Sequence, residues 1–370
     1  MAESKITATT LEMFQEYHWL MLKVFFDATL ERFGEDALEI IRRGAYDCGV
    51  YRGQRMHDQA SSFLRDRTAV SLIEGWDTGE WELAAIDGSL TVTRTPTELI
   101  LELPEAPGTS FFAQHGSSIT ALEIYWPALV AGIVEGFGAG LSAQVSTATD
   151  SPWSLRLSTA SAARDDEGPV LGLGESQPQA LLEMSRRTSG LIAAFQMYVS
   201  RELVRRFDAA GEEVVQAASY QFGALRGGAI RAKHLSEGTE ITLANFASKS
   251  GLQERDPSEA VFVFSEEQYV SDGAYYLDCT YCPLQEVWAH EGAEGLRLGY
   301  LFDAANHRGL FQSYHPETIV RWDSVKSRGD SVCRFRFTVP SLLTEDDPTP
   351  EQFASLRTVR GLLPLSEKER

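Results

Sequence analysis

The residues best suited to chemistry lie close together near the C-terminal end of the chain. Cys279 and Cys282 form a Cys-x-x-Cys pair, and Pro283 directly follows Cys282. Proline favours extended geometry in the residue before it and suits the first turn of a helix, so Cys282 is predicted at a helix N-terminus. The N–H groups and positive dipole end there stabilise a thiolate. We therefore predict that Cys282 is a nucleophile; the alternative is a small buried cysteine.

Two further side chains follow Cys282 at helical spacing. Glu286 and His290 are four residues apart, so they share one face of the predicted helix. A cysteine nucleophile, a histidine base and an acidic partner form a coherent catalytic set. The alternative is a solvated Glu–His pair on a surface helix.

Cys279 has three interpretations. A redox Cys-x-x-Cys pair would be expected in a thioredoxin-like context, which the flanking residues do not provide. A zinc site would need two more ligands, for which the candidates are Cys333, His290, His307 and His315. No second paired spacing supports such a site. We predict no metal and a structural role for Cys279.

Asp303 and two histidines are the next candidates. Asp303 ends the apolar run LGYLF and precedes small residues and Asn306, a pattern typical of a turn or cap. Its functional alternative is to orient a base or bind a polar substrate group. His307 and His315 are flanked by turn residues, which favours surface positions, with a place in a pocket wall as the alternative.

Cys333 and Arg226 also have two interpretations each. Cys333 alternates with Phe335 and Phe337, so it faces the apolar side of a strand, either as core or as a pocket-facing thiol. Arg226 could hold a substrate carboxylate or pair with a buried acid between helices.

The elements around these residues are both helical and extended. Helical periodicity covers residues 10–33, 119–143 and 181–207, whereas residues 81–103 alternate as short strands. This mixture predicts the α+β class. Residues 159–180 are small, polar and rich in Gly, Pro and acid, which is typical of a linker. We predict domains at 1–158 and 181–340 and a C-terminal tail at 341–370.

The two predicted domains share a pattern. The segment LERF, which ends at Phe33, precedes Tyr46-x-x-Gly49-x-x-Arg52-Gly53, and VRRF, which ends at Phe207, precedes the same motif at Tyr220 to Gly227 without a gap. The strand WSLRL can be aligned with CRFRF, which places Trp153 at the position of Cys333. We predict a tandem duplication in which a degenerate first half packs on the second as a pseudo-dimer. The alternative is two similar amphipathic helices.

Length, charge and cysteine content limit the function classes. The chain has 370 residues, which suggests two domains. Its formal charge of -20 disfavours nucleic acid and anionic membranes as partners. No apolar run approaches the roughly 20 residues of a membrane-spanning helix, and the N-terminus lacks the pattern of a signal peptide. Four cysteines are too few for a disulfide scaffold, which favours the cytoplasm.

The order of motifs in the second half resembles a known family. Cys282-Pro283 is followed by a Gly-rich segment ending at Asp303, by Tyr314 and Pro316, and by Gly329-Asp330-x-x-Cys333-x-Phe335. This order is similar to the L-2-amino-thiazoline-4-carboxylic acid hydrolase family and, more loosely, to small-ligand domains of the 4-vinyl reductase type. The resemblance implies an α+β domain that opens a cyclic amidine-like substrate at a C–N bond. Cys282, Asp303 and Cys333 occupy the matching positions.

Together these patterns predict a hydrolase-like enzyme acting on a small cyclic or acyl substrate. Cys282 attacks, His290 moves the proton, with His307 and His315 as the alternatives, and Asp303 orients the base; no cofactor is expected. The substrate-binding candidates are Cys333, Tyr276, Trp288, His307, His315 and Arg226. A small-molecule substrate and possible homo-oligomerisation are expected. The alternatives are a non-catalytic module that binds a small apolar ligand and an assembly partner in a larger complex.

Overall fold

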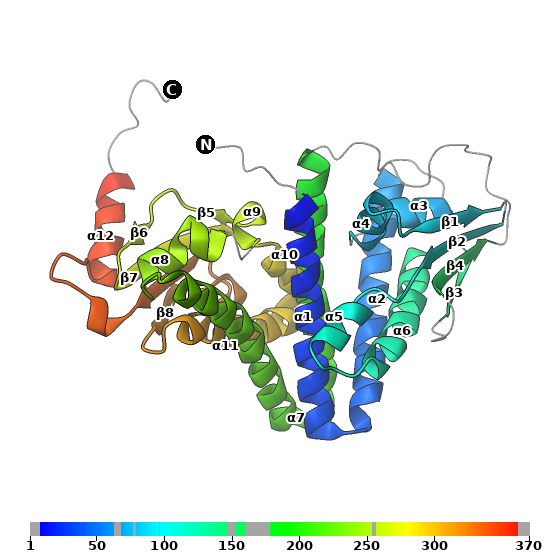
Figure 1. Cartoon of the computed structure of the whole chain (residues 1–370), viewed down its shortest axis with the longest axis horizontal. Helices are drawn as coiled ribbons and strands as arrows, with labels where there is room; N and C mark the ends of the chain where they lie inside the picture. The colour runs from blue at the N-terminus through cyan, green and yellow to red at the C-terminus, as the bar shows by residue number, and fades with distance from the viewer. Residues whose placement is uncertain are drawn as a thin grey trace. The chain divides into compact units, whose positions relative to one another are not determined.

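The computed structural model describes residues 8–62, 68–76, 79–95, 97–138, 140–146, 152–159, 178–253 and 257–361 (Figure 1). Helices and two antiparallel sheets make up this part of the chain, which confirms the predicted α+β class. The chain divides into two compact units, each made from two separate stretches. Unit 1 comprises Met1–Ala218 and Pro283–Phe302, and unit 2 comprises Ser219–Cys282 and Asp303–Arg370.

Unit 1 combines long helices with a four-stranded sheet. Its first helices are α1 (Ala8–Phe33), α2 (Asp36–Ser62), α3 (Ala69–Glu74), α4 (Glu80–Ile86), α5 (Thr109–Gln114) and α6 (Thr120–Phe137). The sheet has the order β1-β2-β4-β3, with β1 (Thr91–Arg94), β2 (Glu98–Leu103), β3 (Leu141–Ser146) and β4 (Trp153–Thr159) all paired antiparallel. The first part of α7 (Pro178–Glu237), α10 (Pro283–His290) and the first part of α11 (Gly292–Tyr314) complete the unit.

Glycines bring α2 and α6 into backbone contact. A Cβ added at Gly49 would overlap the carbonyl oxygen of Leu129, and one added at Gly132 would overlap that of Tyr46. Only residues without a side chain permit this approach. The glycines of the repeated motif are therefore packing residues.

Unit 2 holds the second sheet. Its order is β5-β7-β9-β8, and β6 also pairs with β7. The strands are β5 (Val263–Phe264), β6 (Tyr269–Val270), β7 (Ala274–Tyr281), β8 (Ile319–Ser324) and β9 (Cys333–Thr338). Short helices lie at α8 (Leu243–Ala247), η1 (Lys249–Gln253), α9 (Ser258–Val261), η2 (Lys326–Arg328) and η3 (Pro340–Leu342), and α12 (Pro350–Gly361) follows.

The helix contact of unit 1 recurs inside unit 2. A Cβ at Gly223 of α7 would overlap the carbonyl oxygen of Asn306 of α11, and one at Gly309 would overlap that of Tyr220. Gly223 occupies the same place in the repeated motif as Gly49, and Gly309 makes the return contact that Gly132 makes in unit 1. The two halves thus repeat the same reciprocal glycine contact.

The sheets repeat as well. In each half the chain runs through a strand, a helical segment and two more strands. The last of these strands lies between the other two, which gives the order β2-β4-β3 in the first sheet and β7-β9-β8 in the second. The pair Leu103–Trp153 of the first sheet then corresponds to Cys279–Cys333 of the second. This agrees with the predicted alignment of Trp153 with Cys333. The pseudo-dimer arrangement stays a prediction.

The α-helix that opens each half ends at a residue with positive φ. Gly34, with φ of 57°, follows α1, and Asp208, with φ of 47° and ψ of -121°, interrupts α7. The two positions match, because they directly follow Phe33 and Phe207 at the ends of LERF and VRRF. Glycine adopts positive φ at little cost, whereas an aspartate there is strained. The predicted helix over 181–207 therefore ends at a break just after Phe207.

Other predicted boundaries shift or fall outside the described residues. The helix expected over 119–143 ends at Phe137, because residues 141–146 form β3, and the strands expected over 81–103 begin only after α4. Residues 160–177 of the linker and 362–370 of the tail lie outside the described residues. The domain boundaries drawn from the repeat remain predictions. Among the described residues, no helix is both long and apolar enough to cross a membrane.

Candidate active site

Two cysteines face each other across neighbouring strands of unit 2. In the antiparallel pair β7–β9, Cys279 lies opposite Cys333, and Leu277 lies opposite Phe335. Alternate strand residues point to the same side, so both thiols share the face that carries Phe337. Both residues are buried, with 3% and 5% of their surface exposed. Cys333 thus lies on the predicted strand face, beside a second thiol.

The second part of α11 packs on this face. Phe311 stacks on Phe337 with ring centroids 3.6 Å apart, and His307 lies 4.8 Å from Phe335. Four helical residues rise about 6 Å, which is close to the roughly 6.6 Å of two strand residues. The next residue in the helical row, Asp303, therefore comes beside Cys333. After burial, the charge of Asp303 is the largest cause that raises the pKa of the Cys333 thiol, to about 12.

Asp303 has an unusual environment for a carboxyl group. Ser327 Oγ donates a hydrogen bond to its Oδ2 at 3.2 Å. Burial raises the pKa of Asp303 to about 7, although the bond from Ser327 acts in the opposite direction. A carboxyl with a pKa near 7 is matched to proton transfer at neutral pH. Asp303 can therefore act as a general base or acid.

The turn 325–330 presents its groups to both Asp303 and Cys333. Asp330 Oδ2 accepts a hydrogen bond from Val325 N at 2.8 Å, and Gly329 has φ of 94°. The closed turn directs Ser327 Oγ towards Asp303, and Lys326 N donates to Cys333 Sγ at 3.3 Å. The Gly-Asp-x-x-Cys pattern therefore shapes the turn that completes the site.

Cys279 forms a hydrogen bond with the last residue of its own strand, β7. Its Sγ donates to the carbonyl oxygen of Tyr281 at 3.1 Å, and burial, followed by the charge of Cys333, raises the pKa of its thiol to about 12. Lys326 Nζ donates to the carbonyl oxygen of Thr280 at 2.6 Å, and its charge lowers the pKa of both thiols. A titratable carboxyl, two protonated thiols and an ammonium group thus meet here.

Cys282 and His290 fall in different units. As predicted, α10 begins at Pro283, immediately after the partly exposed Cys282. His290 lies in unit 1, where its Nδ1 is 3.1 Å from Glu291 Oε1 and its ring is 5.4 Å from that of Tyr51. Their pairing as nucleophile and base stays a prediction.

The turn interpretations of Asp303 and His307 are wrong. Both residues lie within α11, where Gly309 packs against α7 and does not break the helix. His307 is partly buried between Phe335 and Trp322, and its Nδ1 lies 2.9 Å from the carbonyl oxygen of Asp303. His315 directly follows the end of α11; burial is the largest cause that lowers its pKa.

Three other predicted substrate-binding residues have packing contacts. Tyr276 points to the opposite face of β7 from Cys279, and its hydroxyl donates to the carbonyl oxygen of Pro348. Trp288 is buried in unit 1, where its indole N–H donates to Gln196 Oε1 at 3.1 Å. Arg226 donates to Asn306 Oδ1 at 3.3 Å inside unit 2.

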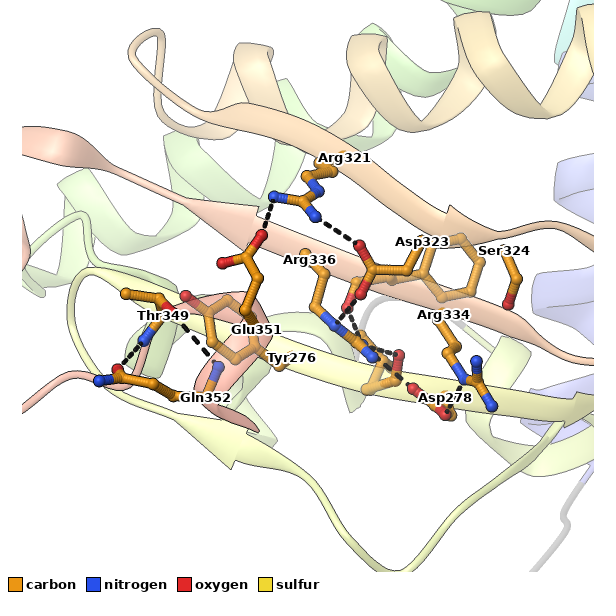
Figure 2. A network of polar contacts seen from close by, with 12 residues as sticks. Tyr276, Asp278, Arg321, Asp323, Ser324, Arg334, Arg336, Thr349, Glu351 and Gln352 are labelled. Carbon is orange, nitrogen blue, oxygen red and sulfur yellow. Dashed lines mark hydrogen bonds and ion pairs between the residues drawn. The ribbon is translucent and has the colours of Figure 1, made fainter. Parts of the chain in front are cut away.

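The opposite face of the second sheet carries an ion network that is buried at Arg336 and Asp278 and exposed at Arg321 and Glu351 (Figure 2). Arg336, only 1% exposed, donates to Asp278 Oδ1 at 3.0 Å and pairs with Asp323. Arg321 joins Asp323 to Glu351 of α12. Tyr276 and Phe353 cover this network with aromatic rings.

Ser327 and Lys326 were not predicted as site residues. Nothing in the sequence distinguishes them from other turn residues; only the folded turn brings them to Asp303 and Cys333. No group of three or more metal-ligating side chains in the described ranges is arranged to hold a metal ion.

Comparison with known proteins found one family model, which matches the second half of the chain. Residues 189–337 match the model of the L-2-amino-thiazoline-4-carboxylic acid hydrolase family, which confirms the resemblance for this part of the chain. The matched segment runs from α7 to β9 and contains Cys279, Asp303, Ser327 and Cys333. No curated protein and no solved structure matched the chain.

Proposed function

We propose that the chain is a hydrolase that opens the ring of a small thiazoline-type cyclic amidine, with Asp303 as its general base. The observation that carries this proposal is the carboxyl of Asp303, whose pKa burial raises to about 7, beside Cys333 within the matched segment. A base with a pKa near the working pH is the usual requirement for activating water.

The chemistry follows from the amidine carbon. Ionised Asp303 takes a proton from water as the oxygen attacks that carbon, which gives a tetrahedral adduct. The adduct collapses with cleavage of a ring C–N bond, or of the ring C–S bond in a related opening. Asp303 passes the water proton to the ring nitrogen as the adduct forms. As the carbonyl forms, Asp303 takes the hydroxyl proton of the adduct and gives it to the leaving nitrogen or sulfur, so the carboxylate is regenerated.

The neighbouring groups supply binding and charge stabilisation. Cys279 and Cys333 are protonated at neutral pH, since the pKa of each thiol is raised to about 12. Lys326 places a positive charge near both thiols, which favours a substrate carboxylate beside them. His307 and Phe335 offer ring faces one helical turn from Asp303.

The test uses the purified full-length chain with 2-amino-thiazoline-4-carboxylate. Asp303→Asn should lower kcat/KM by at least about 100-fold, because the general base is lost. The matched control is Asp272→Asn, an exposed carboxylate of the same unit, which should keep full activity. For the wild type, kcat/KM should rise with pH through about 7, as Asp303 loses its proton. Unchanged turnover in Asp303→Asn would refute the proposal.

Cys282 provides a second route through a covalent intermediate. Its place before α10 favours a thiolate nucleophile. Cys282→Ser separates the routes: retained turnover supports water activation by Asp303, whereas lost turnover with a thiol-linked adduct in the wild type supports the Cys282 nucleophile. Tight binding of the thiazoline without turnover in the wild type would favour the non-catalytic ligand-binding module.

The first half lacks the reactive residues of the second, which supports one catalytic site per chain. The strand pair Cys279–Cys333 corresponds to Leu103–Trp153, and when Gly309 is aligned with Gly132, Asp303 falls on Trp126. The rings of Trp126 and Trp153 lie 5.5 Å apart, and both residues are buried. Indole rings therefore take the place of the carboxyl and one thiol, which is why we propose that the first half is a degenerate copy.

A further inference from the structure

We propose that Cys279 and Cys333 form a reversible disulfide under oxidising conditions and that this bond switches off the site around Asp303. The disulfide requires only the strand register; its regulatory effect rests on the proposed hydrolase function. Neither thiol is disulfide-bonded in the described structure.

The strand register brings the two thiols within bonding reach. Residues directly opposite each other in an antiparallel pair have Cα atoms about 4.5–5.5 Å apart. A disulfide needs a Cα separation of about 4.4–6.8 Å. Cys279 and Cys333 occupy such opposite positions and point to the same face, so the bond can form without a change of register. Cys282 follows the end of β7 and lies outside this register.

The groups around the pair connect it to the proposed base. Lys326 N donates to Cys333 Sγ from the same turn whose Ser327 donates to Asp303. Cys279 Sγ donates to the carbonyl oxygen of Tyr281. A sulfur–sulfur bond removes both thiol protons and draws the sulfur atoms together. It therefore removes two hydrogen-bond donors next to Asp303 and alters the contact that holds the turn.

The oxidant is a small peroxide, which reacts with the small thiolate fraction of either cysteine; because the pKa of both thiols is raised to about 12, the reaction quickens as the pH rises. One thiol reduces hydrogen peroxide to water and becomes a sulfenic acid. The second thiol then attacks this sulfur and displaces a second water molecule. Overall, two thiols and one peroxide give one disulfide and two waters, with both electrons coming from the sulfurs. A dithiol reductant reverses the reaction by exchange.

The experiment detects the bond directly in the native full-length chain. After treatment with hydrogen peroxide, remaining thiols are blocked under denaturing conditions and tryptic peptides are weighed. The cross-linked peptides should be 256–297, which holds Cys279, and 329–334, which holds Cys333, joined with the loss of two hydrogens. Cys282→Ser should keep this product, and Cys279→Ser and Cys333→Ser should each abolish it.

Activity is the second readout. The oxidised wild-type chain should lose at least about 10-fold in turnover, in step with the yield of the 256–297 to 329–334 product, and recover it after dithiothreitol treatment. A loop within peptide 256–297, joining Cys279 to Cys282, would overturn the proposal, as would peroxide oxidation of Cys282 without the 256–297 to 329–334 product. Formation of that product with full activity would refute the switch. The peptide masses need no substrate, so they remain decisive even if the hydrolase proposal fails.

Discussion

The raised pKa of Asp303 suits the proposed general base but lowers the stability of the fold when the carboxyl is ionised. A carboxyl group in water ionises near pH 4, and burial beside Cys333 raises the pKa of this one to about 7. The folded chain therefore binds this proton more tightly than the unfolded chain does. Above the unfolded pKa, each further rise in pH makes ionised Asp303 more costly to the fold, until the folded pKa is passed.

This opposition predicts a pH-dependent stabilisation by Asp303→Asn. The amide keeps the shape but carries no charge, so the variant should gain stability progressively between about pH 4 and pH 7. The gain over the wild type should reach on the order of 2–4 kcal/mol at pH 8. Urea unfolding of both proteins at pH 5.5 and pH 8 measures it. An equal difference at both pH values would contradict the raised pKa of Asp303.

For single residues, the sequence predicts which side chains are reactive better than it predicts which side chains they contact. The alternation of Cys333 with Phe335 and Phe337 correctly places it on a strand face. The contact of Ser327 with Asp303 depends on a folded turn between β8 and β9, and no short-range pattern encodes it. The pairing of Cys279 with Cys333 depends on the register of two strands that are far apart in the sequence.

Ion pairs stabilise the face of the second sheet that lies opposite Cys279 and Cys333. Arg336 and Asp278 are 1% and 2% exposed, so neither can exchange its partner for water (Figure 2). Removing one partner of such a pair leaves an uncompensated buried charge. The sheet that carries Cys279 and Cys333 should therefore depend strongly on Asp278.

Asp278→Asn should destabilise the chain by about 3 kcal/mol. Urea denaturation followed by circular dichroism measures this change. The control is Glu351→Gln, which breaks the exposed ion pair with Arg321 and should leave the unfolding midpoint unchanged. Equal effects of the two substitutions would show that burial of the pair does not matter.

The break in α7 leads to a second prediction for the elements. Asp208 has φ of 47°, and Gly34, at the matching position of the first half, has φ of 57°. Asp208→Gly should raise the free energy of unfolding by about 1 kcal/mol through relief of backbone strain. The reverse change, Gly34→Asp, should lower it, since no atom lies within 4 Å of the added Cβ and the effect is confined to the backbone. Thermal unfolding of both variants tests the pair.

The types of the elements could be predicted where a periodic pattern was long. The prediction was wrong for part of α11, where a glycine packs against another helix and does not end its own. The long helix over 10–33 and the strand of Cys333 are confirmed. The turn interpretation of Asp303 relied on the small residues and Asn306 that follow the apolar run, and that of His307 on its turn-type neighbours. In the fold, Gly309 is a contact point for α7, and the helix continues to Tyr314. Sequence alone does not distinguish a glycine that ends a helix from one that packs against another.

On the scale of the whole molecule, the repeated topology leads to a test of stoichiometry. The sheets of the two halves have the same strand order, but Cys279, Asp303 and Cys333 belong to the second half. Isothermal titration of the thiazoline into Asp303→Asn, which binds without turnover, should give one site per chain. Two equivalent sites would show that the first half keeps a working pocket despite Trp126 and Trp153.

The turn 325–330 can be substituted to change the contacts of Asp303 and Cys333. Val325 and Asp330 close the turn by their own hydrogen bond, and Ser324 Oγ bonds to the carbonyl oxygen of Val332 at its base. The turn is therefore an exchangeable segment: substitutions within it alter what touches Asp303 and Cys333 while β8 and β9 keep their register. A library confined to positions 326–328, which keeps Gly329 and Asp330, should therefore change the substrate preference without loss of the fold.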